Sequence, residues 1–162
     1  MTDIFVTKRD GRVEPLDIEK LHKVVNWACA GLSGVSVSDI EMKSQIQFND
    51  KIRTDRIQSI MIKAAGDLIT ATEPNYQYVA ARLMLFDLRK KVLGQYEPIH
   101  LKQLVDKNVA AGVYDPIILE KYTESEFDVL NSMIKHERDL TFAFAGMQQL
   151  VSKYLVQDRS TK

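Results

Sequence analysis

The chain has 162 residues, and its 22 basic and 22 acidic residues leave a formal net charge of zero, which does not point to nucleic acid or an anionic membrane as a partner. Its one cysteine, Cys29, excludes an internal disulfide and a multi-cysteine zinc site and fits a reducing compartment. The sequence shows neither a signal-peptide pattern nor an apolar run of the ~20 residues that span a bilayer, so we expect a cytoplasmic chain.

The N-terminal segment predicts a β-hairpin followed by a helix. An apolar strand runs into two adjacent cations, Lys8 and Arg9, and then into Asp10-Gly11, a pair that tolerates the positive φ of a tight turn. Asp17 is a suitable N-cap for the amphipathic run that follows it. We therefore expect both cations at a hairpin tip beside a helix N-terminus, an arrangement suited to a polyanion such as a nucleotide phosphate chain.

Two helices are predicted next. Apolar residues recur at helical spacing from Leu21 to Cys29, and Gly31 is a natural stop. In that stripe Cys29 is expected to be a small core residue rather than a reactive thiol. The second helix begins either at a capping box that starts at Ser38 or one turn earlier at a cap provided by Ser36.

Two longer helices complete the first part of the chain. Thr54 is the predicted N-cap of the third helix, and Thr72-Glu73-Pro74 opens the fourth, since proline is tolerated in a first turn. The apolar stripe of the fourth helix continues to Lys90 and ends at Gly94, where we place a domain boundary. The residues expected to be buried by these two helices are Ile57, Ile60, Met61, Ala64, Leu68, Val79, Leu83 and Phe86.

Beyond the boundary the pattern stays helical. One helix is expected from Leu101 to Val109, ended by Gly112, and a capping box at Thr123 opens another that runs to about His136. The apolar run from residue 142 to 155 is too hydrophobic for a solvated tail and needs a partner surface. The predicted fold is therefore mainly α with a small N-terminal β-hairpin.

Several polar residues could contact a ligand, each with an ordinary structural alternative. Lys90 either extends its ammonium into solvent at the end of its helix or reaches a ligand. Thr54 is an N-cap, and the helix that it opens also offers backbone N–H groups to an anion. Gln58 lies one turn further along that helix and faces the same way. Glu14 and Asp17 could accept a ribose hydroxyl or a base amine, or balance nearby cations. The histidines have no metal-site spacing, and no Rossmann, P-loop or nucleophile–base pattern occurs, so no catalytic site is predicted.

Taken together, these segments resemble an ATP-cone domain. The resemblance rests on residues 6–11, Glu14, the helix that begins at Asp17, and residues 76–91. More narrowly, the chain resembles the N-terminus of the large (α) subunit of an aerobic class I ribonucleotide reductase over essentially its whole length. Further segments that carry this likeness are 94–98, 122–127, 138–142 and 153–159.

The resemblance implies a regulatory domain. Residues 1–94 would be the ATP cone, an overall activity switch that ATP turns on and dATP turns off, with Mg²⁺ accompanying the nucleotide. Residues 95–162 would be a helical linker and the start of the reductase's N-terminal helical domain, ahead of its catalytic barrel. The implied partners are the rest of the α subunit, an α homodimer and the small β subunit, with no nucleic acid and no membrane. The chain itself would not be catalytic, although its parent would be a ribonucleoside-diphosphate reductase.

The resemblance also assigns residues to the nucleotide. Lys8, Arg9 and Lys90 match phosphate-contacting positions, Thr54 matches a helix-mouth position, and residues 14–20 match the segment along base and ribose. The complete expected site is Lys8, Arg9, Glu14, Pro15, Leu16, Asp17, Ile18, Glu19, Lys20, Leu21, Thr54, Gln58, Phe86 and Lys90. The chain departs from familiar members at Arg56, Gln58 and Asp87. These departures make ATP binding a firmer expectation than strong inhibition by dATP.

Two other functions fit parts of the sequence. A nucleotide-sensing transcriptional repressor also uses an ATP cone, but it adds a four-cysteine zinc ribbon and a basic surface, and this chain has neither. A helical adaptor could use the basic hairpin tip to bind acidic protein segments. Failure to bind any nucleotide would favour the adaptor.

Overall fold

The computed structural model describes residues 4–8, 10–45 and 47–156. The chain forms two compact units, one made of Met1–Leu88 with Leu140–Lys162 and the other of Arg89–Asp139. The prediction of a mainly α fold with a small N-terminal hairpin is confirmed. No helix in the described part of the chain combines the length and the apolar character that crossing a membrane requires.

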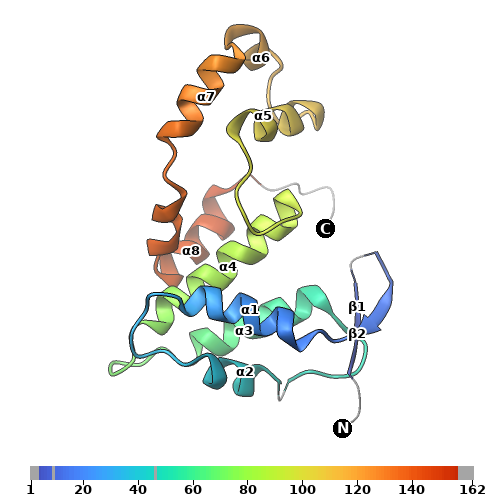
Figure 1. Ribbon diagram of the computed structural model, residues 1–162, viewed down its shortest axis with the longest axis vertical. Coiled ribbons are helices and arrows are strands. Elements are labelled where there is room, and N and C mark those ends of the chain that lie inside the picture. Colours follow the sequence, from blue (N-terminus) through green and yellow to red (C-terminus); the bar gives the residue numbers. More distant parts are fainter. Residues whose placement is uncertain (1–3, 9, 46, 157–162) are drawn as a thin grey trace. The chain divides into compact units, whose positions relative to one another are not determined.

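The first unit contains a small sheet and most of the helices (Figure 1). Its elements in chain order are β1 (Phe5–Thr7), β2 (Val13–Pro15), α1 (Ile18–Cys29), α2 (Val37–Gln45), β3 (Ile52–Arg53), α3 (Thr54–Gly66), α4 (Tyr76–Leu93, which continues into the second unit), α8 (Phe144–Gln149) and a π-helical turn (Leu150–Tyr154). The β1 strand lies in the middle of the sheet, antiparallel to β2 and parallel to β3. The sequence did not predict β3, because two residues are too few to show an alternating pattern.

Local capping residues start and stop the first helices. The Asp17 side chain accepts a hydrogen bond from the Lys20 backbone N–H at 3.0 Å, which confirms Asp17 as the N-cap of α1. After α1 the chain turns through Gly31, whose φ of +71° favours glycine. The hydroxyl of Ser36 accepts from the Asp39 N–H at 3.2 Å. Ser36 therefore caps α2, and the alternative capping box at Ser38 is wrong.

The core of the first unit lies mainly between α1, α3 and α4. Of the residues expected to be buried on α3 and α4, all are buried except Leu68, which is half-buried and follows the end of α3. The buried apolar residues that these three helices contribute are Val24, Val25, Ala28, Cys29, Ile57, Ile60, Met61, Ala64, Ala65, Tyr76, Val79, Ala80, Ala81, Leu83, Leu85 and Phe86. Cys29 is thus a core residue, as predicted.

The C-terminal apolar run finds its partner surface on α4. Met147 of α8 is buried against Ala81 and Leu85, and partly buried neighbours such as Leu140 extend the contact. The Phe144 ring lies where a side chain on Gly66 would project, because a Cβ there would come within 3.1 Å of the ring. The α4 helix is therefore covered on two sides, with the core on one and α8 on the other.

The second unit is smaller. Besides the end of α4 it contains α5 (Leu101–Ala110), α6 (Ile117–Lys121), α7 (Glu124–Met133) and the start of a 3₁₀ segment (His136–Thr141). The predicted capping box at Thr123 is confirmed, since its side chain and that of Glu126 bond each other's backbone N–H. The expected extension of α7 to His136 is wrong, because Ile134 is already extended, with a ψ of 124°.

Candidate functional site

Strand register places the hairpin tip beside the N-terminus of α3. Thr7 of β1 pairs with Arg53 of the parallel strand β3, so the next residues, Lys8 and Thr54, leave the sheet at the same edge and in the same direction. A cation beside a helix N-terminus is the arrangement predicted for an anion site. The helix differs from the expected one, however. The Leu16 N–H bonds the Ile4 carbonyl oxygen, which places the start of α1 at the opposite end of β1.

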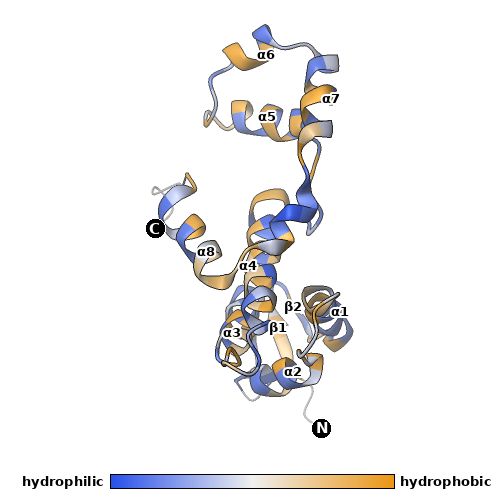
Figure 2. Ribbon diagram, turned by 90° about the vertical axis from the view of Figure 1, so that its left-hand side faces the viewer, coloured by the Kyte–Doolittle hydropathy of each residue, from blue (hydrophilic) through white to orange (hydrophobic). Residues whose placement is uncertain are grey.

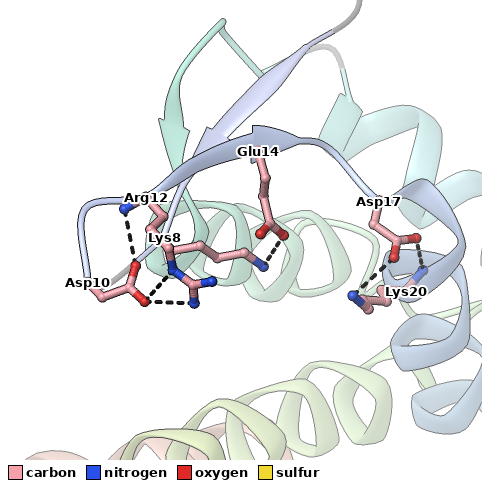
Figure 3. Close-up of polar contacts among 6 residues, drawn as sticks. All are labelled: Lys8, Asp10, Arg12, Glu14, Asp17 and Lys20. Atoms are coloured by element: carbon pink, nitrogen blue, oxygen red, sulfur yellow. Dashed lines mark hydrogen bonds and ion pairs between the residues drawn. The ribbon is translucent and has the colours of Figure 1, made fainter.

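The hairpin carries an ion pair on its inner face. Glu14 lies opposite Val6, which is buried, and the Lys8 ammonium lies 2.8 Å from the Glu14 carboxylate (Figure 3). Side chains alternate between the faces of a strand, so Lys8 is on the same face as Val6. The side chains of Lys8 and Glu14 are 31% and 37% exposed, which leaves both accessible from solvent. Of the alternatives for Glu14, balancing a nearby cation is the one that this structure shows.

The turn itself holds a second pair of opposite charges. Gly11 has a φ of +86°, as expected for this tight turn, and its N–H bonds the Lys8 carbonyl oxygen at 3.0 Å. The guanidinium of Arg12 lies 2.7 Å from the Asp10 carboxylate, and the hydrogen bond from the Arg12 backbone is the largest cause that lowers the pKa of Asp10. Arg12 is thus a tip cation that the predicted site omitted. Arg9 lies outside the described residues.

The mouth of α3 differs from its prediction. Arg53, not Thr54, occupies the N-cap position, and no side-chain cap is present there. Asp55 in the first turn accepts the Arg56 backbone N–H at 2.9 Å and two bonds from the Arg53 guanidinium at 3.1 and 3.0 Å. The hydrogen bonds from Arg53 are the main reason that the pKa of Asp55 is lowered. Sequence reasoning missed Arg53, although its position directly before a predicted helix start was a usable signal.

The first turn of α1 forms an open polar rim. The Asp17 carboxylate caps the helix and lies 3.2 Å from the Lys20 ammonium, and the N–H of Lys20 is the first cause of its lowered pKa (Figure 3). Pro15, Ile18 and Glu19 are exposed as well. Leu16 and Leu21 are half-buried at the base of this rim. The segment predicted to run along base and ribose is therefore accessible to a ligand.

The remaining predicted site residues have structural roles of their own. Gln58 is buried and donates from its amide to the Leu83 carbonyl oxygen at 3.2 Å, which ties α3 to α4. Phe86 is buried on α4. Lys90 belongs to the second unit, where its ammonium donates to the Gly94 carbonyl oxygen at 2.7 Å and lies 5.4 Å from the centre of the Tyr96 ring. That is the helix-end arrangement given as its alternative, and its contact with a nucleotide stays a prediction.

Fold and site together define a class of protein, a mainly helical domain with a basic hairpin tip beside a helix N-terminus. The chain belongs to the ATP-cone domain family, whose sequence pattern matches residues 4–91. This membership makes the matched region a nucleotide-binding regulatory domain.

Similar proteins extend the likeness beyond the cone. The chain is 52% identical over 158 residues to the ribonucleoside-diphosphate reductase 1 subunit alpha of Salmonella typhimurium and 50% identical over 159 residues to that of Escherichia coli K12. It is 46% identical over 160 residues to the ribonucleoside-diphosphate reductase subunit alpha of Enterobacteria phage T4. Each match covers 98% of this chain and 21% of the relative. The chain therefore spans about a fifth of these relatives and corresponds to their N-terminal region.

Proposed function

We propose that this chain is the allosteric activity-control region of a ribonucleoside-diphosphate reductase α subunit. In this proposal ATP binds the cone as an activator and dATP binds it as an inhibitor of the reduction of ribonucleotides to deoxyribonucleotides. The observation that carries it is the register of β1 and β3, which sets Lys8 beside the N-terminus of α3 within a domain of the ATP-cone family. The domain boundary at Gly94 is part of the same proposal.

A phosphate group can take Lys8 from its present partner. The Lys8–Glu14 pair is about one-third exposed, and such pairs contribute only about 0–1 kcal/mol because water and salt screen them. A charge-assisted hydrogen bond from an ammonium to a phosphate contributes roughly 1.5–3 kcal/mol. The exchange is therefore favourable, and it frees the Glu14 carboxylate to accept a hydrogen bond from a ribose hydroxyl.

The arrangement of charges fits a nucleotide better than a bare metal ion. Besides the half-buried Lys8, the exposed cations Arg53 and Arg56 lie at or near the phosphate end of the site. No group of three His, Cys, Asp or Glu side chains in the described part of the chain could hold a metal ion. We propose that Mg²⁺ is held mainly by the nucleotide's own phosphate oxygens, as is usual for this ion.

Discrimination between ATP and dATP has to come from the sugar. The two nucleotides differ by one ribose hydroxyl, and one hydrogen bond is worth about 1–3 kcal/mol. A ligand that binds two conformations equally shifts neither, so this hydroxyl has to be sensed differently in the active and inhibited states. The polar rim at the start of α1, with Asp17, Glu19 and Lys20, offers the acceptors and donors for this contact. The states that it selects would be assemblies with the rest of α, a second α subunit and the β subunit.

The test is binding and thermal unfolding of this chain with Mg²⁺ and ATP, dATP or GTP. At one hundred times its dissociation constant, a ligand stabilises the fold by about 2.7 kcal/mol. For a chain of this size that corresponds to a midpoint shift of roughly 5–11 °C. We expect a shift with ATP and dATP and none with GTP.

A pair of matched variants tests the site itself. Lys8→Met is expected to weaken ATP and dATP alike by about 1.5–3 kcal/mol in titration calorimetry, because it removes a charge-assisted bond common to both. The control is Lys63→Met, since Lys63 forms an equally short 2.8 Å pair with Asp67 at the other end of α3. Equal affinity in both variants would contradict the assignment of Lys8. No binding of any nucleotide would contradict the proposed function and favour the adaptor.

A further inference from the structure

We propose that the Asp87 carboxylate is a direct ligand of the Mg²⁺ ion that accompanies a nucleotide bound to the cone. This inference deepens the proposed function and rests on it. The phosphate oxygens remain the main ligands of the ion, and Asp87 adds one oxygen from the protein.

Asp87 interrupts an otherwise apolar part of the core. It is 8% exposed and is the only buried acidic or basic side chain in the described part of the chain. The other buried residues of α4 are apolar or aromatic, and hydrophobic colouring along this helix is visible in Figure 2. Buried charged groups in proteins are usually paired with an opposite charge or bound to a metal ion. A carboxylate in this position therefore indicates a site for a cation.

A hydrogen bond between α3 and α4 shows which part of α3 lies near Asp87. The side-chain amide of Gln58 on α3 donates to the Leu83 carbonyl oxygen at 3.2 Å. In an α-helix each carbonyl oxygen points toward the C-terminus and accepts the N–H four residues further on, which for Leu83 is that of Asp87. The Gln58 amide therefore lies beside the turn of α4 that ends at Asp87.

The two helices run in roughly opposite directions. Figure 1 shows α3 leading through the loop of residues 67–75 into α4, which returns past it. The end of α3 and the start of α4 both lie along α2. The Lys43 ammonium of α2 donates to the Asp67 carbonyl oxygen at 3.4 Å, just after α3. At the start of α2 the Ser36 N–H donates to the hydroxyl of Tyr76, the first residue of α4, at 3.0 Å.

These directions place Asp87 at the phosphate end of the proposed site. Asp87 is one turn along α4 from Leu83, and Thr54 is one turn back along α3 from Gln58, so both lie at the same end of the helix pair. The pairing of β1 with β3 sets Lys8 at this end as well. All of these residues belong to the first unit. The carboxylate, the cation and the N-terminus of α3 therefore share one end of the domain.

A buried carboxylate at this end favours a nucleotide only if a cation lies between them. A triphosphate carries several negative charges, and like charges repel more strongly where little water screens them. Mg²⁺ takes oxygen ligands and is usually bound in proteins by one or two carboxylates together with phosphates. Asp87 is not without a partner in this structure. Its two oxygens offer about four lone-pair positions, so it can bind a metal ion and keep that partner.

Other carboxylates near this end are less suited to the ion. Asp55 is held by two hydrogen bonds from the Arg53 guanidinium, at 3.1 and 3.0 Å. Arg53 pairs with the residue before Lys8, and successive side chains of a strand point to opposite faces, so Arg53 is on the face opposite to Lys8. The Glu14 side chain is 37% exposed, which lets water screen its charge. Of these three carboxylates only that of Asp87 is buried.

Calorimetry of ATP binding in Mg²⁺ and in EDTA tests the metal contact. ATP is titrated into this chain and into Asp87→Asn, which keeps the shape of the side chain and removes its charge. Loss of even an indirect partner of a metal site costs roughly 10–100-fold in metal affinity, so we expect the gain in ATP affinity that Mg²⁺ gives to shrink by at least ~10-fold. Without the metal ion the variant should bind ATP as tightly as the unaltered chain or more tightly, because a repelling charge is gone.

The matched control is Asp55→Asn. This variant also removes a carboxylate at the mouth of α3, but that carboxylate is held by Arg53. We expect the gain from Mg²⁺ to be unchanged in this control. Circular dichroism and the unfolding midpoint without nucleotide show whether each variant keeps the fold.

A second measurement does not depend on any variant. Chromium(III)–ATP carries a metal ion that exchanges its ligands too slowly to accept a carboxylate. We expect the unaltered chain to bind it at least ~10-fold less tightly than Mg²⁺–ATP, the same loss that removal of the ligand causes.

Each other outcome overturns the inference. If Asp87→Asn binds ATP more tightly by the same factor with and without Mg²⁺, Asp87 only repels the phosphates. If binding weakens by the same factor in both conditions, Asp87 has a structural role. Chromium(III)–ATP that binds the unaltered chain as tightly as Mg²⁺–ATP would overturn the inference even if the variant failed to fold. Absence of any ATP binding by the unaltered chain would overturn the proposed function as well, which distinguishes the two failures.

Discussion

Arg82 on α4 is expected to stabilise the first unit by joining three segments of the chain. Its guanidinium donates to the carbonyl oxygens of Ala28 at 3.0 Å and Ala30 at 2.7 Å, at the end of α1, and to that of Leu140 at 3.1 Å. The last carbonyls of a helix have no partner within it, so this side chain completes α1 and at the same time holds the segment that leads into α8. Burial lowers the pKa of Arg82 from an ordinary value far above neutral, and the group remains charged.

The replacement Arg82→Met keeps most of the apolar stem and removes all three donors. The Ala30 carbonyl is exposed and can bond water, so we count only the two partly buried bonds. At about 1.5 kcal/mol for each bond from a charged donor, the expected loss is about 3 kcal/mol. For a chain of this length that lowers the unfolding midpoint by roughly 6–12 °C.

The assay is thermal and urea unfolding of the variant, with hydrogen exchange of residues 140–151 as a second measurement. Arg12→Met is the control, because Arg12 forms an exposed pair at the hairpin tip and its loss should cost no more than about 0.5 kcal/mol. Arg82→Lys, which keeps the charge but not the fork of donors, should fall between the two. If Arg82→Met is as stable as Arg12→Met and its 140–151 amides stay protected, the reasoning is refuted.

Three further predictions concern single residues. Gly66→Val is expected to lower the free energy of unfolding by about 1–3 kcal/mol in urea, because its side chain would meet the Phe144 ring; unchanged stability would show that α8 shifts freely. Thr123→Ala should cost about 1 kcal/mol by removing the cap of α7, whereas Thr123→Ser should not, and circular dichroism with urea titration distinguishes them. Burial raises the pKa of Cys29 from 9.0 to about 11, so the stabilisation from its neutral thiol is complete below pH 9.0 and is lost as pH rises towards 11. Urea unfolding across that range should show a steeper decline than in Cys29→Ala, and parallel curves would contradict it.

Much of the fold could be predicted from the sequence because its signals are local. Asp17 and Thr123 cap helices through backbone groups three residues away, and Gly11 and Gly31 adopt the positive φ that their turns require. Such interactions depend on neighbours within one helical turn, so their pattern is already present in the sequence. The same reasoning misplaced the start of α2 by a few residues, because Ser36 and Ser38 both carry a hydroxyl that can accept a capping hydrogen bond.

The candidate site was predicted in its residue types but not in its assembly. From the residue spacing Lys8 was expected beside the N-terminus of α1, yet it lies beside that of α3, because the two-residue strand β3 joins β1 by long-range pairing. The resemblance to the ATP cone had assigned Thr54, at the start of α3, to the same end of the site as Lys8. Gln58 could be identified as polar and near the site, but its burial and its bond to Leu83 depend on how α3 packs against α4. Neither the pairing of β1 with β3 nor the packing of α3 against α4 produces a periodic pattern in the sequence.

The sequence by itself therefore determined most of the helices, the caps at Asp17 and Thr123, the hairpin with its basic tip and the likeness to the ATP cone. Only the tertiary structure decided that the pairing of β1 with β3 brings the N-terminus of α3 to Lys8, that Glu14 holds this cation, and that the apolar run after residue 142 packs on α4. The physical reason is the range of the interactions. Capping and turn formation are fixed by residues a few positions apart, whereas strand pairing and helix packing join segments tens of residues apart and depend on the whole core.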